Sequence, residues 1–593
     1  MVIASPHSLR LAAIVAVLIG GARCGSGMGS RPEVDGAPSG SATLDGGALD
    51  VGVGAWTAPT TAPAPVPLDD VTVYAFSQTP DDVGDPQVLA LAPDMNMRAW
   101  QRFDTYGVMN DYDFRYVADA HAAGVKVFIG GTTATALFPD EFPNAQFPSL
   151  SVDDVSTRDA NNQPVIHDKI LPDLRRGSLA NPEYRAYLVR ICKMQIDGGV
   201  DGLYFDEINQ DYEGADFDGN EGFDAYHLAD FNAYLLWRFP GADYGAMFGM
   251  TSDNLLTAGV PAGDLVNNFN YQKYLAGRGW GSSPFDSRNP LRAIWGQTVG
   301  GRPTPGAADF VNSAEPYRYW GAIVSELRDY AQRTYGRAIY LAVNGVYPLV
   351  DFQGVGLFAY NNDGDGGAEA PYVPVMAGST TMAAQLDGTV SLQRPFLNLK
   401  TRSEALAPGA PVVLFLDWPN DFISYFFSMP PTQREDYWRI YAAEAYANGL
   451  FFAFHLQDTV GDPSATQLGL MPLYQRLAAF YRGHATFYHH VAAATEGVTS
   501  QITTSLTTAV MLAVADQSAP RRRLVHLVNH DYHGALVEHD GFTVTVPVPG
   551  APAVTLASPD AASDITLPVT YANGTATVTV PSLIAYDVLT FAY

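Results

Sequence analysis

Short β-rich runs recur along the first three quarters of the chain, and stretches with helical periodicity separate several of them. The helical pattern is clearest at residues 112–123, 320–335 and 434–447. Strands that alternate with helices predict a parallel sheet, and a set of eight predicts a closed TIM (β/α)8 barrel, an α/β fold. The eight runs comprise residues 71–76, 97–100, 125–129, 200–206, 339–344, 355–360, 412–417 and 450–455.

The fourth run is the most informative because it ends in two adjacent carboxylates, Asp206 and Glu207. A predicted helix precedes it, with Asn181 as the N-cap before a proline and the pair Gly198-Gly199 as the stop signal. In a (β/α)8 barrel the chemistry lies at the C-terminal ends of the strands. The two acids therefore stand where a barrel enzyme places its functional groups.

Two further regions depart from the barrel pattern. An insertion of about 208–318 follows the fourth strand, and a loop of that length at a barrel mouth is usually functional. After the predicted barrel, residues 68–481, short alternating runs return with the hairpin signal Asn573-Gly574. They predict an antiparallel β-sandwich over residues 482–593, with strands at 525–529, 542–546, 576–580 and 586–591.

Strand alternation predicts which side chains face the barrel interior. In the fourth strand Leu203 and Phe205 form the more apolar set, which should pack on the helices, so Tyr204 and Asp206 should point inward. The same argument at strands five, seven and eight directs Asn344, Asp417 and His455 to a shared ring at the mouth, and the loop after strand six adds Asn361 and Asp363.

Paired carboxylates across a barrel mouth suit the cleavage of a glycosidic bond, because one attacks the sugar or activates water and the other donates a proton. The catalytic candidates are Asp206, Glu207, Asp363 and Asp417. The alternative is a purely structural role, in which each acid caps a loop or pairs with a basic side chain. The candidate substrate-binding residues, which include aromatic rings for sugar stacking, are Trp100, Tyr204, Trp295, Asn344, Asn361, Trp418 and His455.

The amino-acid composition limits the classes of molecule that the protein is expected to bind. The net charge of −28 would repel nucleic acid and disfavours polyanionic substrates. The chain has only two cysteines, Cys24 and Cys192, which excludes a disulfide framework and a cysteine-based zinc site. Calcium is the one candidate cofactor, since Asp216, Asp218 and Asn220 are spaced like the start of a calcium loop, although His227 replaces the closing Glu.

The N-terminus resembles an export signal. Arg10 precedes an apolar run, residues 11–19, that is too short to span a bilayer. Cys24 follows, as in a bacterial lipoprotein signal in which the cysteine is lipidated, so residues 1–24 are expected to be a signal peptide. Residues 25–67, rich in Gly, Ala, Pro, Ser and Thr, predict a flexible tether. We therefore expect an extracytoplasmic protein, either a surface or periplasmic lipoprotein or a secreted one.

The stretch from Asn181-Pro182 to Gly199-Val200-Asp201-Gly202-Leu203-Tyr204-Phe205-Asp206-Glu207 resembles the fourth-strand signature of (β/α)8 glycoside hydrolases, closest to α-galactosidase-like and dextranase-like families. Residues 527–532 and 584–588 resemble the β-sandwich appended to such enzymes. The resemblance implies that Asp206 is the nucleophile. It leaves the acid open among Glu207, Asp363 and Asp417, because strand five offers Asn344 where those families place an acid.

The sequence thus favours an exported glycoside hydrolase that acts on a neutral oligo- or polysaccharide. A second hypothesis is a non-catalytic surface glycan-binding protein, built on a barrel that has lost one carboxylate. A third is a barrel hydrolase that acts on peptidoglycan-linked sugars or amides.

Overall fold

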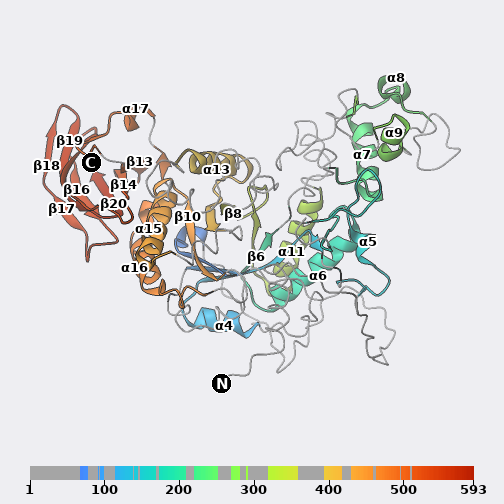
Figure 1. Ribbon diagram of the computed structural model, residues 1–593, viewed down its shortest axis with the longest axis horizontal. Helices are drawn as coiled ribbons and strands as arrows, with labels where there is room; N and C mark the ends of the chain where they lie inside the picture. The colour runs from blue at the N-terminus through green and yellow to red at the C-terminus, as the bar shows by residue number, and fades with distance from the viewer. Residues whose placement is uncertain are drawn as a thin grey trace.

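The computed structural model contains a closed parallel barrel and two large C-terminal antiparallel sheets (Figure 1). A small antiparallel sheet of β4 (Ala136–Leu137) and β5 (Arg175–Arg176) is also present. The structure describes residues 67–77, 91, 94–98, 114–137, 139, 141–143, 147–167, 173–206, 208, 220–251, 269–280, 289–291, 318–357, 393–416, 429–457, 463–489, 491–493, 496–507 and 510–593. The signal peptide and most of the tether predicted from the sequence lie outside these residues.

Eight parallel strands close the barrel in the order β1-β10-β9-β8-β7-β6-β3-β2, which confirms the predicted fold class. Closure is made by β1 against β10, with Tyr74 beside Ala453 and Phe76 beside His455. The strands are β1 (Tyr74–Ser77), β2 (Met95–Arg98), β3 (Val127–Thr133), β6 (Gly202–Asp206), β7 (Tyr340–Asn344), β8 (Phe352–Leu357), β9 (Val412–Leu416) and β10 (Phe451–Gln457).

Two strands begin earlier than the sequence predicted. The second starts at Met95 rather than at residue 97, and the sixth starts at Phe352 rather than at residue 355. The added residues of the sixth strand include the polar Gln353. Its side chain is fully buried, yet both ends of the amide are satisfied by the backbone of Tyr347, at 3.0 and 2.8 Å.

Helix α6 (Pro182–Asp197) leads into β6 and begins and ends at the predicted signals. The Asn181 side chain accepts hydrogen bonds from the backbone N–H groups of Glu183 and Tyr184, and Gly199 adopts a φ of 94° after the last turn. The other helices of the barrel are α4 (Arg115–Ala122), α11 (Arg318–Tyr335), α13 (Gln393–Leu406), α15 (Pro431–Ala447) and α16 (Met471–Gly483). None of the helices described here is both long and apolar enough for a bilayer crossing.

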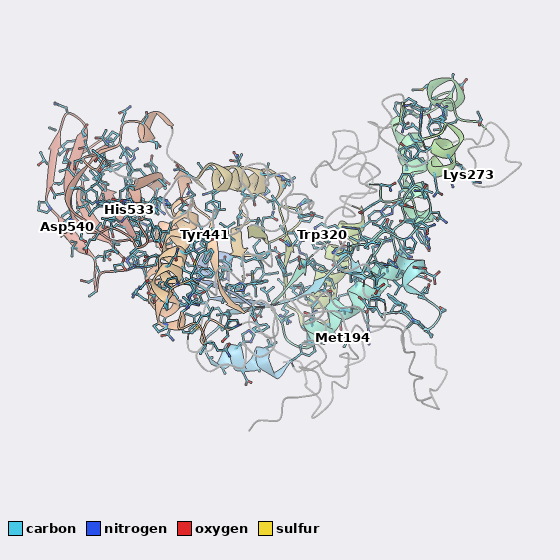
Figure 2. The ribbon with its side chains drawn as sticks, in the orientation of Figure 1. Met194, Lys273, Trp320, Tyr441, His533 and Asp540 are labelled. Carbon is cyan, nitrogen blue, oxygen red and sulfur yellow. The ribbon has the colours of Figure 1, made fainter. Side chains whose placement is uncertain are left out.

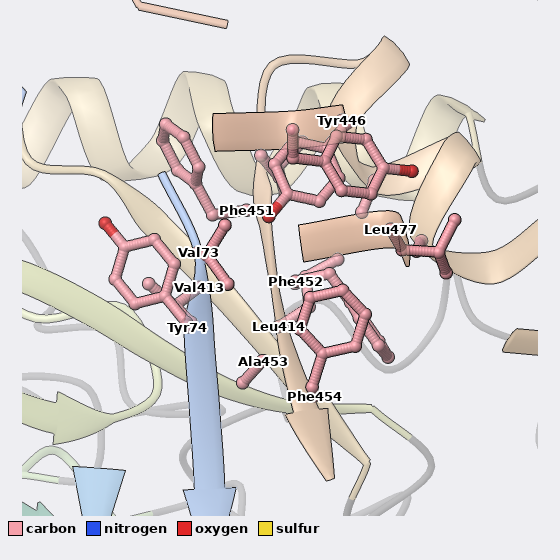
Figure 3. Packing of buried hydrophobic residues seen from close by; sticks show 14 of the residues in the cluster. Val73, Tyr74, Val413, Leu414, Tyr446, Phe451, Phe452, Ala453, Phe454 and Leu477 are labelled. Carbon is pink, nitrogen blue, oxygen red and sulfur yellow. The ribbon is translucent and has the colours of Figure 1, made fainter. Parts of the chain in front are cut away.

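Alternate residues of the strands pack on opposite sides of the barrel wall. Leu203 and Phe205 of β6 belong to the cluster formed with α6 and α11, and the Phe205 ring lies 5.1 Å from that of Trp320. On the other side of the molecule, Figure 3 shows rings of β10 packed against α15 and α16, among them Phe452 and Phe454. Burial of one such side chain contributes about 1.5–3 kcal/mol to the free energy of unfolding. Apolar contacts between strands and helices therefore stabilise the barrel.

The part of the insertion that the structure describes contains α7 (Ala225–Arg238), α8 (Tyr244–Phe248) and α9 (Tyr271–Gly277), which share a hydrophobic core of their own. These helices lie at the end of the molecule away from the C-terminal sheets (Figure 1). The buried Asp224 carboxylate joins them to the segment before α6, because it accepts hydrogen bonds from the hydroxyls of Thr157 and Ser178 and contacts His227 at 2.6 Å.

The C-terminal region is a β-sandwich of a six-stranded and a four-stranded antiparallel sheet. The predicted hairpin is present: Asn573 and Gly574 have φ values of 53° and 79°, as a type I′ turn requires, and they join β18 to β19. The strands are β11 (Ala492–Ala493), β12 (Thr503–Thr504), β13 (Val510–Ser518), β14 (Arg521–Asn529), β15 (His539–Pro547), β16 (Ala553–Ala557), β17 (Ile565–Leu567), β18 (Val569–Ala572), β19 (Thr575–Leu583) and β20 (Tyr586–Ala592).

Barrel and sandwich share one hydrophobic cluster. Tyr446 of α15 stacks on Tyr481 of α16 at 3.6 Å between ring centroids, and Tyr481 in turn lies 6.3 Å from Tyr586 of β20. Polar contacts flank these rings: the buried His530 of the sandwich pairs with the buried Glu444 of α15 at 2.9 Å. The interface therefore has the character of a core rather than of a loose contact between modules.

Asp587 of β20 is a buried acid in the sandwich. It is 1% exposed, and its Oδ2 has no hydrogen-bond partner among the described residues. Burial raises the pKa of this carboxyl from 3.8 to about 8. Because the folded protein holds the proton more tightly than the unfolded chain, this group lowers the free energy of unfolding progressively as the pH rises from about 4 to about 8.

We expect Asp587→Asn to stabilise the protein at alkaline pH, because it removes the charge that burial disfavours. One pKa unit corresponds to about 1.4 kcal/mol, so the gain should reach several kcal/mol near pH 9 and nearly vanish near pH 4. Denaturant titrations of both proteins across this pH range measure it. Asp540→Asn, which removes an exposed carboxylate on β15 (Figure 2), is the control. An equal stability difference at both pH values would contradict the expectation.

Candidate active site

Asp206 is the last residue of β6, and its side chain is half-buried at the C-terminal end of the barrel. Strand β7 runs beside β6 in parallel, with Tyr204 level with Ala342, so the two strand ends lie next to each other. Asn344, the buried last residue of β7, donates a hydrogen bond from Nδ2 to Asp206 Oδ1 at 2.8 Å. The contact holds the carboxylate in a defined orientation.

Backbone hydrogen bonds to β3 fix the position of Asp206 on the side opposite to β7. The Ala134 N–H, in the segment that follows β3, donates to the carbonyl oxygen of Asp206 at 2.5 Å. Strand β3 also pairs with β6 up to Thr133 beside Asp206. Asp206 is therefore anchored by both neighbouring strands, and a side chain on such rigid elements can be placed more accurately than one on a loop.

Four rings from four strands form a floor inside the barrel. Phe76 of β1 stacks on Phe415 of β9 at 4.7 Å, and the Tyr204 ring of β6 meets both, at 6.5 and 5.9 Å. His455 of β10 lies 6.1 Å from Phe76. Tyr204 is two residues before Asp206 on the same strand face, so the carboxylate lies above this aromatic floor.

His455 is a neutral member of the floor. Its side chain is buried, and burial lowers the pKa of the imidazole from 6.5 to about 3. The ring therefore carries no charge at neutral pH. It can serve as a packing or hydrogen-bonding group toward a neutral ligand, but it does not supply a cation to the mouth.

The structure brings together four of the residues predicted from the sequence: Asp206 and Asn344 by a hydrogen bond, and Tyr204 and His455 through the Phe76 ring. Asp417 directly follows Leu416, the last residue of β9, and lies outside the described residues. The other predicted site residues that lie outside them are Trp100, Glu207, Trp295, Asn361, Asp363 and Trp418.

Two residues of this region were not singled out from the sequence. Phe76 is the centre of the aromatic floor, and Ser77 is a fully buried polar residue at the C-terminal end of β1. Their position at the end of the first predicted strand was the only feature of the sequence that pointed to the site. This feature was weak because neither residue is ionisable and because a phenylalanine in a strand is typical of an ordinary core.

The weak calcium candidates receive no support from the described part of the chain. Asn220 Oδ1 accepts a hydrogen bond from the Ala160 N–H at 3.1 Å, while Asp216 and Asp218 lie outside the described residues. No cluster of three or more metal-ligating side chains occurs among the residues that were described.

The fold and the site together define a (β/α)8 barrel with an anchored carboxylate at its mouth and a C-terminal β-sandwich. No family model and no curated protein matches the sequence. Among solved structures, the chain is similar to a Paenibacillus sp. cycloisomaltooligosaccharide glucanotransferase complexed with cycloisomaltoheptaose, at 10% identity and a TM-score of 0.49, over 88% of this chain and 85% of that one.

Two other solved structures are similar over most of their length. One is α-L-fucosidase isoenzyme 2 from Paenibacillus thiaminolyticus, at 8% identity and a TM-score of 0.45, over 88% of this chain and 98% of that chain. The other is an α-amylase from H. orenii, at 11% identity and a TM-score of 0.43, with the same coverage of 88% and 98%. The assignment of the fold rests on the strand order of this chain.

Gly354 of β8 makes room for the Tyr204 ring. A Cβ at this position would lie 2.5 Å from Tyr204 Cε2, so even a methyl group must displace the ring below Asp206. We expect Gly354→Ala to lower the free energy of unfolding by about 1–3 kcal/mol. Gly483→Ala, at the end of α16, is the matched control, since a Cβ there meets nothing within 4 Å. Denaturant unfolding compares the two, and equal stability would contradict this packing.

Proposed function

We propose that this protein is a glycoside hydrolase in which Asp206 acts as the nucleophile or as the base. The observation that carries the proposal is the position of Asp206: it ends β6 at the barrel mouth, above an aromatic floor, with its carboxylate oriented by Asn344. Barrel enzymes place their reactive groups at this end of the strands.

The second carboxyl group is proposed to come from Glu207, Asp363 or Asp417. Asp417 follows β9, the strand that supplies Phe415 to the same floor as Tyr204, which supports it as a partner across the mouth. In a retaining mechanism Asp206 attacks the anomeric carbon while the partner protonates the leaving oxygen. That mechanism needs carboxyl groups about 5 Å apart, whereas a separation of roughly 6.5–9.5 Å gives inversion with Asp206 as the base for water.

The substrate is proposed to be a neutral oligo- or polysaccharide. The net charge of −28 disfavours a polyanionic glycan, and the imidazole of His455 is neutral at the floor of the barrel. The rings of the floor are buried, so stacking on the apolar sides of sugar rings is proposed for Trp418, which follows Asp417, while Asp206 and Asn344 offer polar groups for hydroxyls. The identity of the sugar is best found with a panel of aryl glycosides and neutral polysaccharides.

We expect Asp206→Asn to reduce kcat by a factor of about 10⁴ or more on any substrate found in such a panel, because an amide can neither attack the sugar nor accept the proton. Asn has the same shape, so circular dichroism should remain unchanged. Asp540→Asn should keep full activity. Turnover near that of the wild type by Asp206→Asn would reject the assigned role.

The same experiment separates the hydrolase from a glycan-binding protein on a barrel that lacks a working acid pair. A binding protein would retain polysaccharide affinity without any turnover in the wild type, and Asp206→Asn would then change affinity alone. Hydrolysis by the wild type combined with loss in the variant supports the enzyme.

We propose an extracytoplasmic location with a lipid anchor on Cys24 and a tether over residues 25–67. The support is the apolar run before Cys24 and the Gly-, Ala- and Pro-rich composition after it. Cys24→Ser should move most of the protein from the membrane fraction to the soluble exported fraction of a bacterial host, as measured by fractionation and fatty-acid labelling. Equal partition of both proteins would favour plain secretion.

A further inference from the structure

A cavity of about 420 Å³ lies between the barrel and the β-sandwich, away from the mouth. It is lined by α13, by the C-terminal end of α15 with the turn before β10, and by β13 and β14 of the sandwich. This turn precedes β10, so the cavity lies near the N-terminal ends of the barrel strands, whereas Asp206 lies at a C-terminal end. Boundaries between domains are a preferred place for small-molecule sites, and the volume is in the range typical of them.

Lys400 of α13 is the only charged residue among the described residues that line the cavity. Its side chain is half-buried, and none of the described residues accepts a hydrogen bond from its ammonium group or forms an ion pair with it. The ammonium lies against Gly449, where the missing Cβ leaves it room. Burial lowers the pKa of Lys400, and the charge of Glu404, one turn further along α13, offsets this shift only in part.

The polar side chains around Lys400 already have partners. Gln393 donates to the carbonyl of Leu512, Asn448 donates to that of Glu444, and Tyr446 donates to that of Thr72. His526 bonds to the Tyr586 hydroxyl through Nδ1, and burial lowers its pKa to about 3, so it is neutral. Each of these side chains is held by a contact inside the protein, so Lys400 is the group of the lining that is left to bind a ligand by charge.

The rest of the lining is mainly apolar, with Leu397, Phe487, Ala513 and Val514 among the contributors. A ligand that matches this environment has one negative charge and an apolar body the size of a ring. The pairing of its charge with Lys400 would also remove the cost of holding an unpaired ammonium in a partly desolvated place.

We propose that this cavity binds a small organic monocarboxylate, with its carboxylate on Lys400 and its apolar body against Leu397 and Phe487. The site is distinct from the barrel mouth and does not depend on the hydrolase activity proposed above. Its ligand is therefore an anion, in contrast to the neutral glycan proposed for the mouth.

Benzoate is the probe, and its neutral isostere benzamide is the matched ligand. We expect benzoate to bind the full-length protein saturably in titration calorimetry, with a Kd of about 1 mM or below, and benzamide to bind at least about tenfold more weakly. Asp206→Asn should bind benzoate as the wild type does. Failure of benzoate to bind, or equal affinity for the two ligands, would overturn the proposal.

Variants test the role of the ammonium. Lys400→Met should weaken benzoate binding by about tenfold to a hundredfold, and Lys400→Arg should retain most of it, since a charge-assisted hydrogen bond is lost in one and kept in the other. The control is Lys273→Met on the exposed face of α9, at the far end of the molecule (Figure 2). Unchanged affinity in Lys400→Met would refute the assignment.

Chemical labelling gives a second readout that does not depend on a variant. Only a neutral amine reacts with acetic anhydride, so bound benzoate should protect Lys400 while Lys273 reacts as before, as peptide mass spectrometry can quantify. Equal acetylation of Lys400 with and without saturating benzoate would count against the site.

Discussion

The pairing of β1 with β10 is the constraint on which the rest of the structure depends, because it turns a parallel sheet into a closed barrel. Once the sheet is closed, alternate residues of every strand have either the interior or the surrounding helices as their environment. The apolar Leu203 and Phe205 take the helical side, which leaves Tyr204 and Asp206 for the interior. The position of the candidate acid follows from this division and not from a local contact alone.

The hydrogen bond between Asn344 and Asp206 links this architecture to the proposed chemistry. It joins the ends of two adjacent strands, so its geometry is set by the register of β6 and β7. The aromatic floor beneath is likewise built from four strands, and Gly354 is small because the Tyr204 ring occupies the space of a side chain. The residues that stabilise this part of the barrel are therefore also those on which the proposed chemistry depends.

Much of the fold could be predicted from periodicity, because six of the eight barrel strands and the Asn573-Gly574 hairpin carry strong local signals. The start of β8 could not, since the burial of Gln353 depends on the Tyr347 backbone, which only the folded chain provides. In the site, alternation predicted the inward direction of Asp206 and Asn344. Phe76 was missed because a phenylalanine in a strand is common, and its role arises from contacts between strands distant in sequence.

The common core of the barrel and the sandwich has a consequence for how this architecture can change. Tyr446, Tyr481 and Tyr586 belong to a single buried cluster, so loss of the sandwich would expose the aromatic side chains of α15 and α16 to water. Exchange of this sandwich for an unrelated sheet domain would therefore need compensating substitutions on α15 and α16. Each part constrains the substitutions that the other tolerates.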